Sequence, residues 1–342
     1  MKRQLLIILS LLLSLSLAAQ TTGAYMGGSL FPVRVNDRYG YIDQRGKLVI
    51  KPQFIDAREF SEGLARVWVA GGKGRWGYVG LTGKMAIPAQ FEWAEDFSEG
   101  LAVVKIDGKY GVIDKTGQLL FTMGGCRQIG YFHESLATVQ DANTGKWGYI
   151  GPSGDIVIQA ALDYAGPFHE GVAAVRFGSD WVYMDRNGKP AIPYKFERAE
   201  NFSEGLAAIQ INGKWGFIDK TGNWVINHVY DGVENFSEGL AAVRVDGEWG
   251  FIDKTGTVVI PIKYNLAKGF SEGLAAVRVD AEKDIWCYID KTGRRVATFT
   301  GVTAENFSNG LARLSRENLN YEGADFLIDY IDKSGKRVWQ EK

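Results

Sequence analysis

An internal repeat occupies most of the chain. The string Phe-Ser-Glu-Gly-Leu-Ala, or a close variant, recurs every 34 to 37 residues, beginning at Phe60, Phe97, Phe132, Phe168, Phe202, Phe236, Phe270 and Phe307. A second string, aromatic-Gly-aromatic-Ile-Asp, keeps step with it and starts at Tyr39, Trp76, Tyr110, Trp147, Trp181, Trp215, Trp249 and Trp286, with Ile328 in the ninth copy. A fixed period of this size indicates a tandem array whose units pack on their neighbours. We therefore expect one domain of about nine units between Leu30 and Trp339.

The seventh unit indicates what one repeat forms. Residues 240–245 alternate as a half-buried strand does, and Asp246-Gly247 has the composition of a two-residue hairpin turn. Residues 249–253 make the returning strand, and residues 257–261 make a third strand that ends at a proline. The stretch 263–273 has no period and is expected to be a connecting loop. Each unit is thus predicted to be a three-stranded antiparallel meander.

The predicted fold is an all-β tandem array of about nine such meanders. Glycine, at 43 of 342 residues, supports many short strands joined by tight turns. The first unit starts with its own first strand, residues 30–35, and the last ends with its own third strand, residues 337–339. Because no strand is exchanged between the ends to lock a ring, the sequence favours an open superhelix or solenoid. A closed propeller-like ring is the alternative.

The repeated string resembles the WG repeat family of bacterial proteins, also called KWG repeats. The resemblance covers nearly all of the chain after residue 20. It implies a β-rich repeat protein, often exported or surface-linked, with no activity common to the family and no catalytic residues to transfer. Three units depart from the Trp-Gly pair, with Val182, Cys287 and Asp329 in place of the glycine, and the linker at residues 121–131 abandons the usual pattern.

Residues 1–19 have the pattern of a secretory signal peptide. Lys2 and Arg3 precede an apolar and serine run over residues 5–17, and small residues follow at Ala18 and Ala19. A membrane anchor is the alternative, but the run is shorter than the roughly 18 to 20 apolar residues that a span needs. We expect a mature chain of residues 20–342 without a transmembrane segment, exported to the periplasm, the cell surface or the medium.

The charge balance narrows the class of partner. With 39 Lys and Arg against 40 Asp and Glu, the chain has no excess of positive charge to attract nucleic acid. The repeated aspartates occur in Asp-x-x-Gly strings, a pattern typical of turns rather than of catalysis or calcium binding. No catalytic motif or cofactor motif is present, so the chain is predicted not to be an enzyme and to hold no cofactor.

Two histidines interrupt the repeat. His133 and His169 replace the serine of Phe-Ser-Glu-Gly in successive units, so stacking of the units would bring them together beside Glu134 and Glu170. This arrangement is a weak alternative prediction of a metal site without a visible third ligand. Together with Cys126 these residues also define the alternative function, a cell-wall or glycan-active enzyme with its site in the irregular third and fourth repeats.

The predicted function is a non-catalytic exported binding or scaffold module for a protein or an extended polymer such as a glycan. The in-phase tryptophans are expected to be core, covering the bare backbone of the glycine beside them, whereas the off-pattern rings are candidates for exposed contact. Two charged rows, one of Glu and one of Arg or Lys, are ordinary solvated surface in the simpler interpretation and a recognition surface in the functional one. The candidate contact residues are Trp68, Trp93, Trp224, Glu204, Glu238, Glu272, Arg244 and Arg278. Cys126 and Cys287 are predicted to be free thiols.

Overall fold

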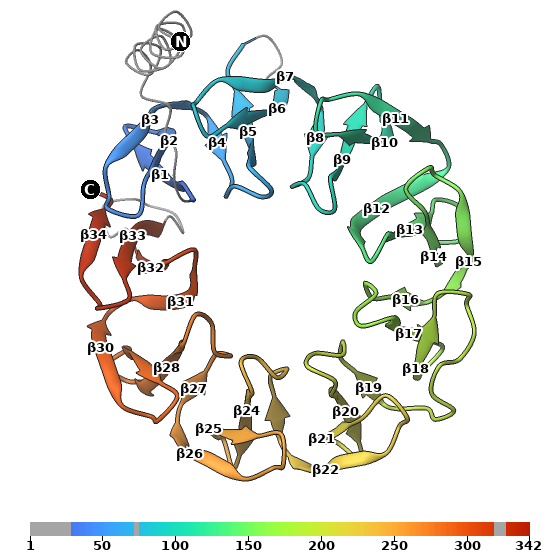
Figure 1. The fold of residues 1–342 in the computed structure, drawn as a ribbon, viewed down its shortest axis with the longest axis vertical. Helices are drawn as coiled ribbons and strands as arrows, with labels where there is room; N and C mark the ends of the chain where they lie inside the picture. Colours follow the sequence, from blue (N-terminus) through green and yellow to red (C-terminus); the bar gives the residue numbers. More distant parts are fainter. Residues whose placement is uncertain (1–28, 72–74, 318–325) are drawn as a thin grey trace, which may run out of the picture.

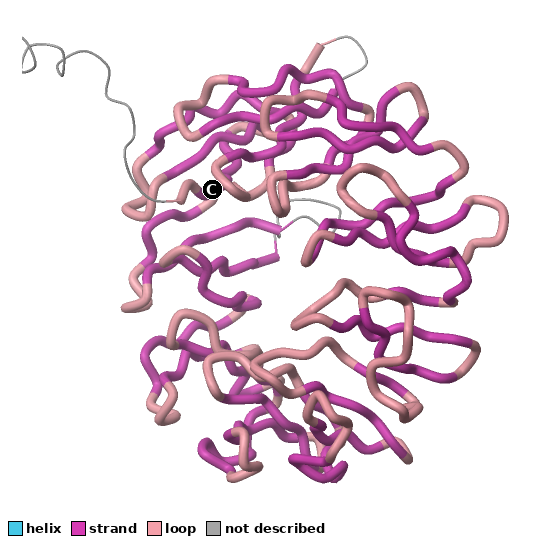
Figure 2. The backbone as a smooth tube through the Cα atoms, turned by 45° about the vertical axis from the view of Figure 1, so that its right-hand side comes forward, coloured by secondary structure: helices cyan, strands magenta, loops and turns pink. Residues whose placement is uncertain are grey.

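The computed structural model describes residues 29–71, 75–317 and 326–342. Within these ranges the chain consists of strands and loops that form nine small antiparallel sheets, arranged as blades around one axis (Figures 1 and 2). The predicted all-β array of nine repeats is confirmed. Of the two predicted arrangements, the structure has the closed ring and not the open superhelix. The predicted signal peptide at residues 1–19 lies outside the described residues.

Successive blades follow one another around the ring in chain order, and each is a simple meander. Blade 1 contains β1 (Phe31–Val35), β2 (Arg38–Ile42) and β3 (Leu48–Phe54). Blade 2 contains β4 (Asp56–Ala57), β5 (Leu64–Val69), β6 (Arg75–Gly80) and β7 (Met85–Phe91). Blade 3 contains β8 (Trp93–Ala94), β9 (Leu101–Ile106), β10 (Lys109–Asp114) and β11 (Leu119–Met123). Blade 4 contains β12 (Cys126–His133), β13 (Leu136–Asp141), β14 (Trp147–Ile150) and β15 (Ile156–Leu162). Blade 5 contains β16 (Tyr164–Ala165), β17 (Val172–Phe177) and β18 (Asp180–Asp185). Blade 6 contains β19 (Arg198–Ala199), β20 (Ala207–Ile211), β21 (Lys214–Ile218) and β22 (Trp224–Tyr230). Blade 7 contains β23 (Gly232–Val233), β24 (Leu240–Val245), β25 (Glu248–Asp253) and β26 (Val258–Tyr264). Blade 8 contains β27 (Leu266–Ala267), β28 (Leu274–Asp280), β29 (Ile285–Asp290) and β30 (Arg295–Thr300). Blade 9 contains β31 (Thr303–Ser308), β32 (Leu311–Glu317), β33 (Phe326–Asp332) and β34 (Arg337–Gln340).

Most blades have one strand more than the sequence predicts. Seven of the nine sheets have four strands, and blades 1 and 5 have three within the described residues. The additional strand lies nearest the axis and comes from the stretch expected to be a connecting loop, as β27 does in blade 8 (Figure 1). That expectation is wrong because a strand of two residues is too short to show an alternating pattern.

The glycine of each Trp-Gly pair allows the outermost strand to approach closely. In blade 7, Trp249 pairs with Tyr264 and Phe251 pairs with Ile260, so β26 bulges opposite Gly250. A Cβ atom on Gly250 would lie 2.7 Å from the carbonyl oxygen of Ile260. The glycine therefore makes room for the backbone of the outer strand.

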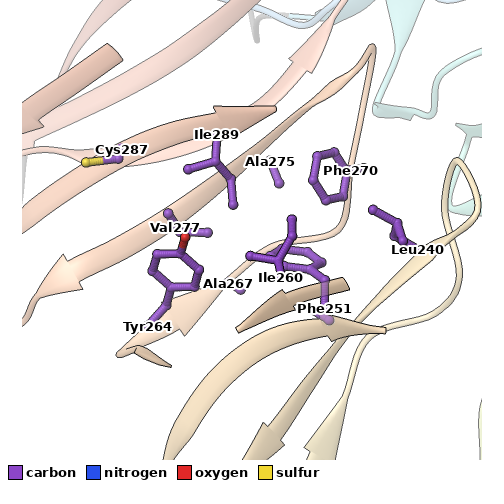
Figure 3. Packing of buried hydrophobic residues seen from close by; sticks show 11 residues of the cluster. Leu240, Phe251, Ile260, Tyr264, Ala267, Phe270, Ala275, Val277, Cys287 and Ile289 are labelled. Carbon is purple, nitrogen blue, oxygen red and sulfur yellow. The ribbon is translucent and has the colours of Figure 1, made fainter. Parts of the chain in front are cut away.

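The hydrophobic core is divided among the junctions between blades. At the junction of blades 7 and 8, Phe251 and Ile260 pack against Phe270, Val277 and other buried side chains (Figure 3). The corresponding cluster of blades 9 and 1 contains Phe31 and Tyr330, whose ring centroids are 5.5 Å apart. Side-chain packing between the first and last blades therefore closes the ring without an exchanged strand, which is why the argument for an open array fails.

Candidate binding surface

The Ser-Glu-Gly turns link each blade to the next. Each turn is a hairpin between the innermost strand and its neighbour, and its glutamate has a positive φ, +55° at Glu238. The Glu238 carboxylate accepts a hydrogen bond from the backbone N–H of Gly273 in the next blade (3.0 Å) and pairs with Lys291 (3.1 Å). The Ser237 hydroxyl donates to the carbonyl oxygen of Phe270. The same glycine contact and lysine pair recur for the glutamates Glu62, Glu170, Glu204 and Glu272.

The Glu row is therefore not a simple solvated surface. The side chains of Glu204, Glu238 and Glu272 are 28 to 29% exposed and each is bonded to the following blade. Of the predicted Arg row, Arg244 lies over the ring of Trp249 at 5.6 Å, and Arg278 donates to the Ala281 carbonyl oxygen. The Glu row thus links neighbouring blades, whereas Arg244 and Arg278 make contacts within their own blades. Contact of either row with a partner stays a prediction.

The turn aspartates have the structural role that the sequence indicates. The Asp253 Oδ1 atom accepts hydrogen bonds from the backbone N–H groups of Thr255 and Thr257 at 2.9 and 3.0 Å. The hydroxyl of Thr255 donates to the same oxygen at 2.6 Å. These bonds lower the pKa of Asp253, the largest contribution coming from the Thr255 hydroxyl. The carboxylates are acceptors within their own turns.

His133 and His169 are adjacent, as predicted. Their ring centroids are 4.9 Å apart, and burial together with the neighbouring His133 lowers the pKa of His169. Glu134 is bonded to Gly171 and Arg186, and Glu170 to Gly205 and Lys220. Among the residues that the structure describes, no three His, Cys, Asp or Glu side chains are placed to hold a metal ion.

Blades 2 to 4 contain a cluster that breaks the repeat symmetry. The Arg66 guanidinium pairs with Glu95 (3.0 Å) and lies over the rings of Trp76 and Trp93 at 5.6 and 5.9 Å. Glu95 also accepts hydrogen bonds from the Trp93 indole N–H (2.9 Å) and the Tyr131 hydroxyl (2.7 Å). One carboxylate thus connects side chains from three consecutive blades, and we call these five residues the Arg66 cluster.

Two rings of the Arg66 cluster reach solvent from the innermost strands. Trp93 on β8 and Tyr131 on β12 are each 45% exposed, although both are anchored to Glu95. Burial, followed by the bond to Glu95, raises the pKa of Tyr131 to about 12. Tyr164 on β16 occupies the Trp93 position in blade 5 and is 43% exposed. The strands β8, β12 and β16, which carry these residues, lie nearest the axis (Figure 1). The rings of Trp93 and Tyr131 are therefore exposed apolar surface that Glu95 holds in place.

The predicted aromatic contacts do not form one group. Trp93 belongs to the Arg66 cluster, and Trp68 packs edge-on against Trp76 at 5.4 Å. Trp224 lies on the outermost strand β22, beside His228. Arg66, Glu95 and Tyr131 are not among the contact residues predicted from the sequence. Arg66 could have been found, because other units have a small or uncharged residue at its repeat position, with the exception of Arg313 in the ninth.

Cys126 is half-buried on β12 and Cys287 is buried on β29, and both are free, as predicted.

Two cavities of the described residues lie at junctions between blades, away from both cysteines. One lies between blades 5 and 6 and is lined by Tyr194, Phe196 and Trp224 among others, and another lies at the junction of blades 9 and 1. Neither cavity includes His133, His169 or Cys126, the residues of the alternative enzymatic site.

Comparison with known proteins supports the family resemblance. A model of the WG containing repeat matches residues 39–69, 76–110, 147–181, 181–215, 215–249 and 249–281. No curated protein sequence matches the chain. A solved eukaryotic initiation factor has a similar fold, with a TM-score of 0.63 and 13% identity over 92% of this chain and 96% of its own. Hsv2 of Kluyveromyces lactis matches with a TM-score of 0.43 and 11% identity over 68% of this chain and 95% of its own.

These structural likenesses, at such low identity, concern the fold alone. None of the described segments is a helix that could cross a membrane. The six family matches together span more than half of the sequence and recur at the period of the blades. The chain belongs to the WG containing repeat family.

Proposed function

We propose that this propeller is an exported, non-catalytic binding module that recognises a protein or an extended polymer. The observation that carries the proposal is the pair of exposed, anchored rings in the Arg66 cluster, Trp93 and Tyr131. Aromatic side chains that are fixed before binding contribute large apolar contact area at little cost in conformational entropy. The N-terminal apolar run of the sequence supports export.

The repeat architecture supports a binding role rather than catalysis. The charged side chains that recur in most units are engaged in turns or in contacts between blades, as Asp253 and Glu238 are. Glu134 and Glu170, the acids of the alternative enzyme site, are bonded in the same way. Such groups stabilise the ring, whereas the symmetry-breaking rings have unused apolar surface for a partner.

The test compares exposed aromatic residues on innermost strands with one on an outermost strand. Trp93→Ala and Tyr131→Ala should reduce capture of the partner from the exported fraction, or retention on a polysaccharide column, by about tenfold each. Trp224→Ala is the matched control, because this ring is also exposed but lies on an outermost strand. Equal capture by all three folded variants would refute the proposed surface. Turnover of a cell-wall substrate that is abolished by Glu134→Gln would support the enzymatic alternative instead.

A further inference from the structure

Blade 5 departs from the other blades at its outer edge. Its sheet ends at β18, and Pro190 and Phe196 pair with that strand only through isolated bridges. Val182 stands where blade 7 has Gly250, the glycine that makes room for the bulge of the outermost strand. Pro190 also lacks the N–H group of a regular ladder. The segment that forms the outer edge of blade 5 is therefore irregular.

A cavity of about 400 Å³ lies between this irregular segment and blade 6. Its floor is apolar, because Phe196, Ile209 and Ile218 are at most 6% exposed. Tyr194 of blade 5 and Trp224 of blade 6 also line it, and they are 52 and 36% exposed. Trp224 begins β22, which lies at the outer edge of the ring (Figure 1). The volume and the mainly apolar lining are typical of a small-molecule site.

The two exposed rings are not part of the repeat. Trp224 is the first residue of its outermost strand, a position that has no ring in seven other blades, where the residues are Leu48, Met85, Leu119, Ile156, Val258, Arg295 and Arg337. Tyr194 stands where blades 1, 2, 4 and 7 have Pro52, Ala89, Ala160 and Ile262. The regular junctions between blades thus pack without these two rings.

Neighbouring groups hold both rings in place. The Tyr194 ring lies against Gly222 of blade 6, where a Cβ atom would come within 2.8 Å of its Cδ2 atom. His228 packs against the Trp224 ring with 4.8 Å between the centroids, and it does not line the cavity. His228 therefore supports the indole from a side other than the cavity. Rings that are fixed before binding lose little conformational entropy when a ligand arrives.

Two polar side chains line the cavity as well. The Lys195 ammonium pairs with Asp180 at 2.7 Å, so its charge is already compensated. The Asn223 amide nitrogen donates to the Thr221 hydroxyl at 2.7 Å, whereas its Oδ1 atom has no donor within the part of the chain that the structure describes. The cavity therefore suits a neutral ring with one hydrogen-bond donor.

We propose that the cavity binds a free, neutral, planar aromatic molecule of the indole class. Its ring packs against Tyr194 and Trp224, and its N–H group donates to the Oδ1 atom of Asn223. A tryptophan side chain of a protein has the same ring, but the peptide groups on either side of it need polar partners. Lys195 is paired and Asn223 offers one acceptor, so a free molecule fits better. This site goes beyond the proposed function and does not involve the Arg66 cluster.

The experiment titrates the full chain with indole and follows binding by saturation-transfer NMR. Indole should occupy one site with a dissociation constant below about 1 mM. Indene has the same shape with a CH₂ group in place of the N–H, and it should bind about threefold to tenfold more weakly because one hydrogen bond is lost. Asn223→Ala should weaken indole binding to a similar extent and remove the preference for indole over indene.

The aromatic rings are tested by leucine, which keeps an apolar wall without an aromatic face. Tyr194→Leu and Trp224→Leu should each weaken indole binding by about threefold to tenfold. Val258→Ala is the matched control, because Val258 has the repeat position of Trp224 in the next blade, and this variant should bind like wild type. Equal binding of indole by wild type and both leucine variants, or equal binding of indole and indene by wild type, overturns the proposal.

Two further measurements separate the possible ligands and sites. Binding of N-acetyl-L-tryptophanamide that is tenfold tighter than that of indole would assign the cavity to a side chain of a partner protein, and this too overturns the proposal. Trp93→Ala should bind indole like wild type, and Trp224→Leu should still capture a partner through the Arg66 cluster. Failure of the indole site is thus distinguishable from failure of the proposed function.

Discussion

The Ser-Glu-Gly turns predict an unusual response to substitution. Glu238 has a φ of +55°, a left-handed conformation that costs a side-chain-bearing residue about 1 kcal/mol and costs glycine little. A glycine should therefore be preferred there if the turn were the only consideration. The carboxylate, however, bonds to Gly273 and Lys291 of the next blade. We infer that this contact between blades outweighs the local strain.

The magnitudes can be estimated from the contacts. A hydrogen bond to a charged group contributes about 1.5 to 3 kcal/mol and a neutral one about 0.5 to 1.5 kcal/mol, so Glu238→Gln should lose about 1 kcal/mol at the Gly273 bond. The Lys291 pair adds about 0.5 kcal/mol at most, because its side chains are 45 and 29% exposed. Glu238→Gly removes both contacts, about 2 kcal/mol, and recovers about 1 kcal/mol of strain. Each variant should therefore be destabilised by about 1 to 1.5 kcal/mol.

Asp246→Gly provides the matched control for Glu238→Gly. Asp246 also has a positive φ, +50°, but it lies in the hairpin turn at the opposite end of the blade. Relief of strain alone should leave Asp246→Gly as stable as wild type or up to about 1 kcal/mol more stable. Urea unfolding followed by tryptophan fluorescence measures all three variants. If Glu238→Gly is stabilised as much as Asp246→Gly, the contact between blades has no net effect and the argument is wrong.

The same contacts predict a loss of stability in acid. Partial burial would raise the pKa of Glu238, but the bonds from Lys291 and Gly273 outweigh it, and the pKa lies below its usual value of 4.5. The pKa values of Glu62, Glu134 and Glu170 are lowered in the same way. A carboxyl group with a lowered pKa in the folded state stabilises the fold fully above its unfolded pKa, and this contribution is lost as the pH falls through the folded value. Stability should decline below about pH 4.5, and less steeply in Glu238→Gln.

Three further predictions concern packing and closure. Gly250→Ala should lower the free energy of unfolding by about 2 to 4 kcal/mol, because its Cβ would lie 2.7 Å from backbone atoms of β26. The control Gly80→Ala, whose Cβ would lie 3.9 Å from its nearest neighbour, should lower it by less than about 1 kcal/mol. The same urea unfolding experiment measures both variants. Tyr330→Ala should cost about 3 to 5 kcal/mol and open the junction of blades 9 and 1, which solution scattering would detect as a larger radius of gyration. Thiol titration of the unfolded, unreduced chain should count two groups, Cys126 and Cys287; a count of zero would contradict the structure.

The repeat made the blades predictable but not their closure. Asp246-Gly247 and the alternation of residues 240–245 indicate a hairpin from local chemistry alone, and the structure contains it. The innermost strands are two residues long in most blades, and they form because the preceding blade and the neighbouring strand hold them in place. Closure likewise depends on Phe31 packing against Tyr330 across about 300 residues. No local pattern contains that contact.

Among the candidate functional residues, too, roles set within one unit could be predicted from the sequence, and roles set by a neighbouring blade could not. The roles of the turn aspartates could be read from a motif that each unit contains within itself. Arg66 and Arg313 show why the remainder could not: they occupy one repeat position, and the sequence alone gives them the same environment. Arg66 meets the carboxylates of Glu95 and Asp96 in blade 3, whereas Arg313 lines a cavity at the junction of blades 9 and 1. In a closed array, a residue that breaks the repeat acquires its role from the neighbouring blade.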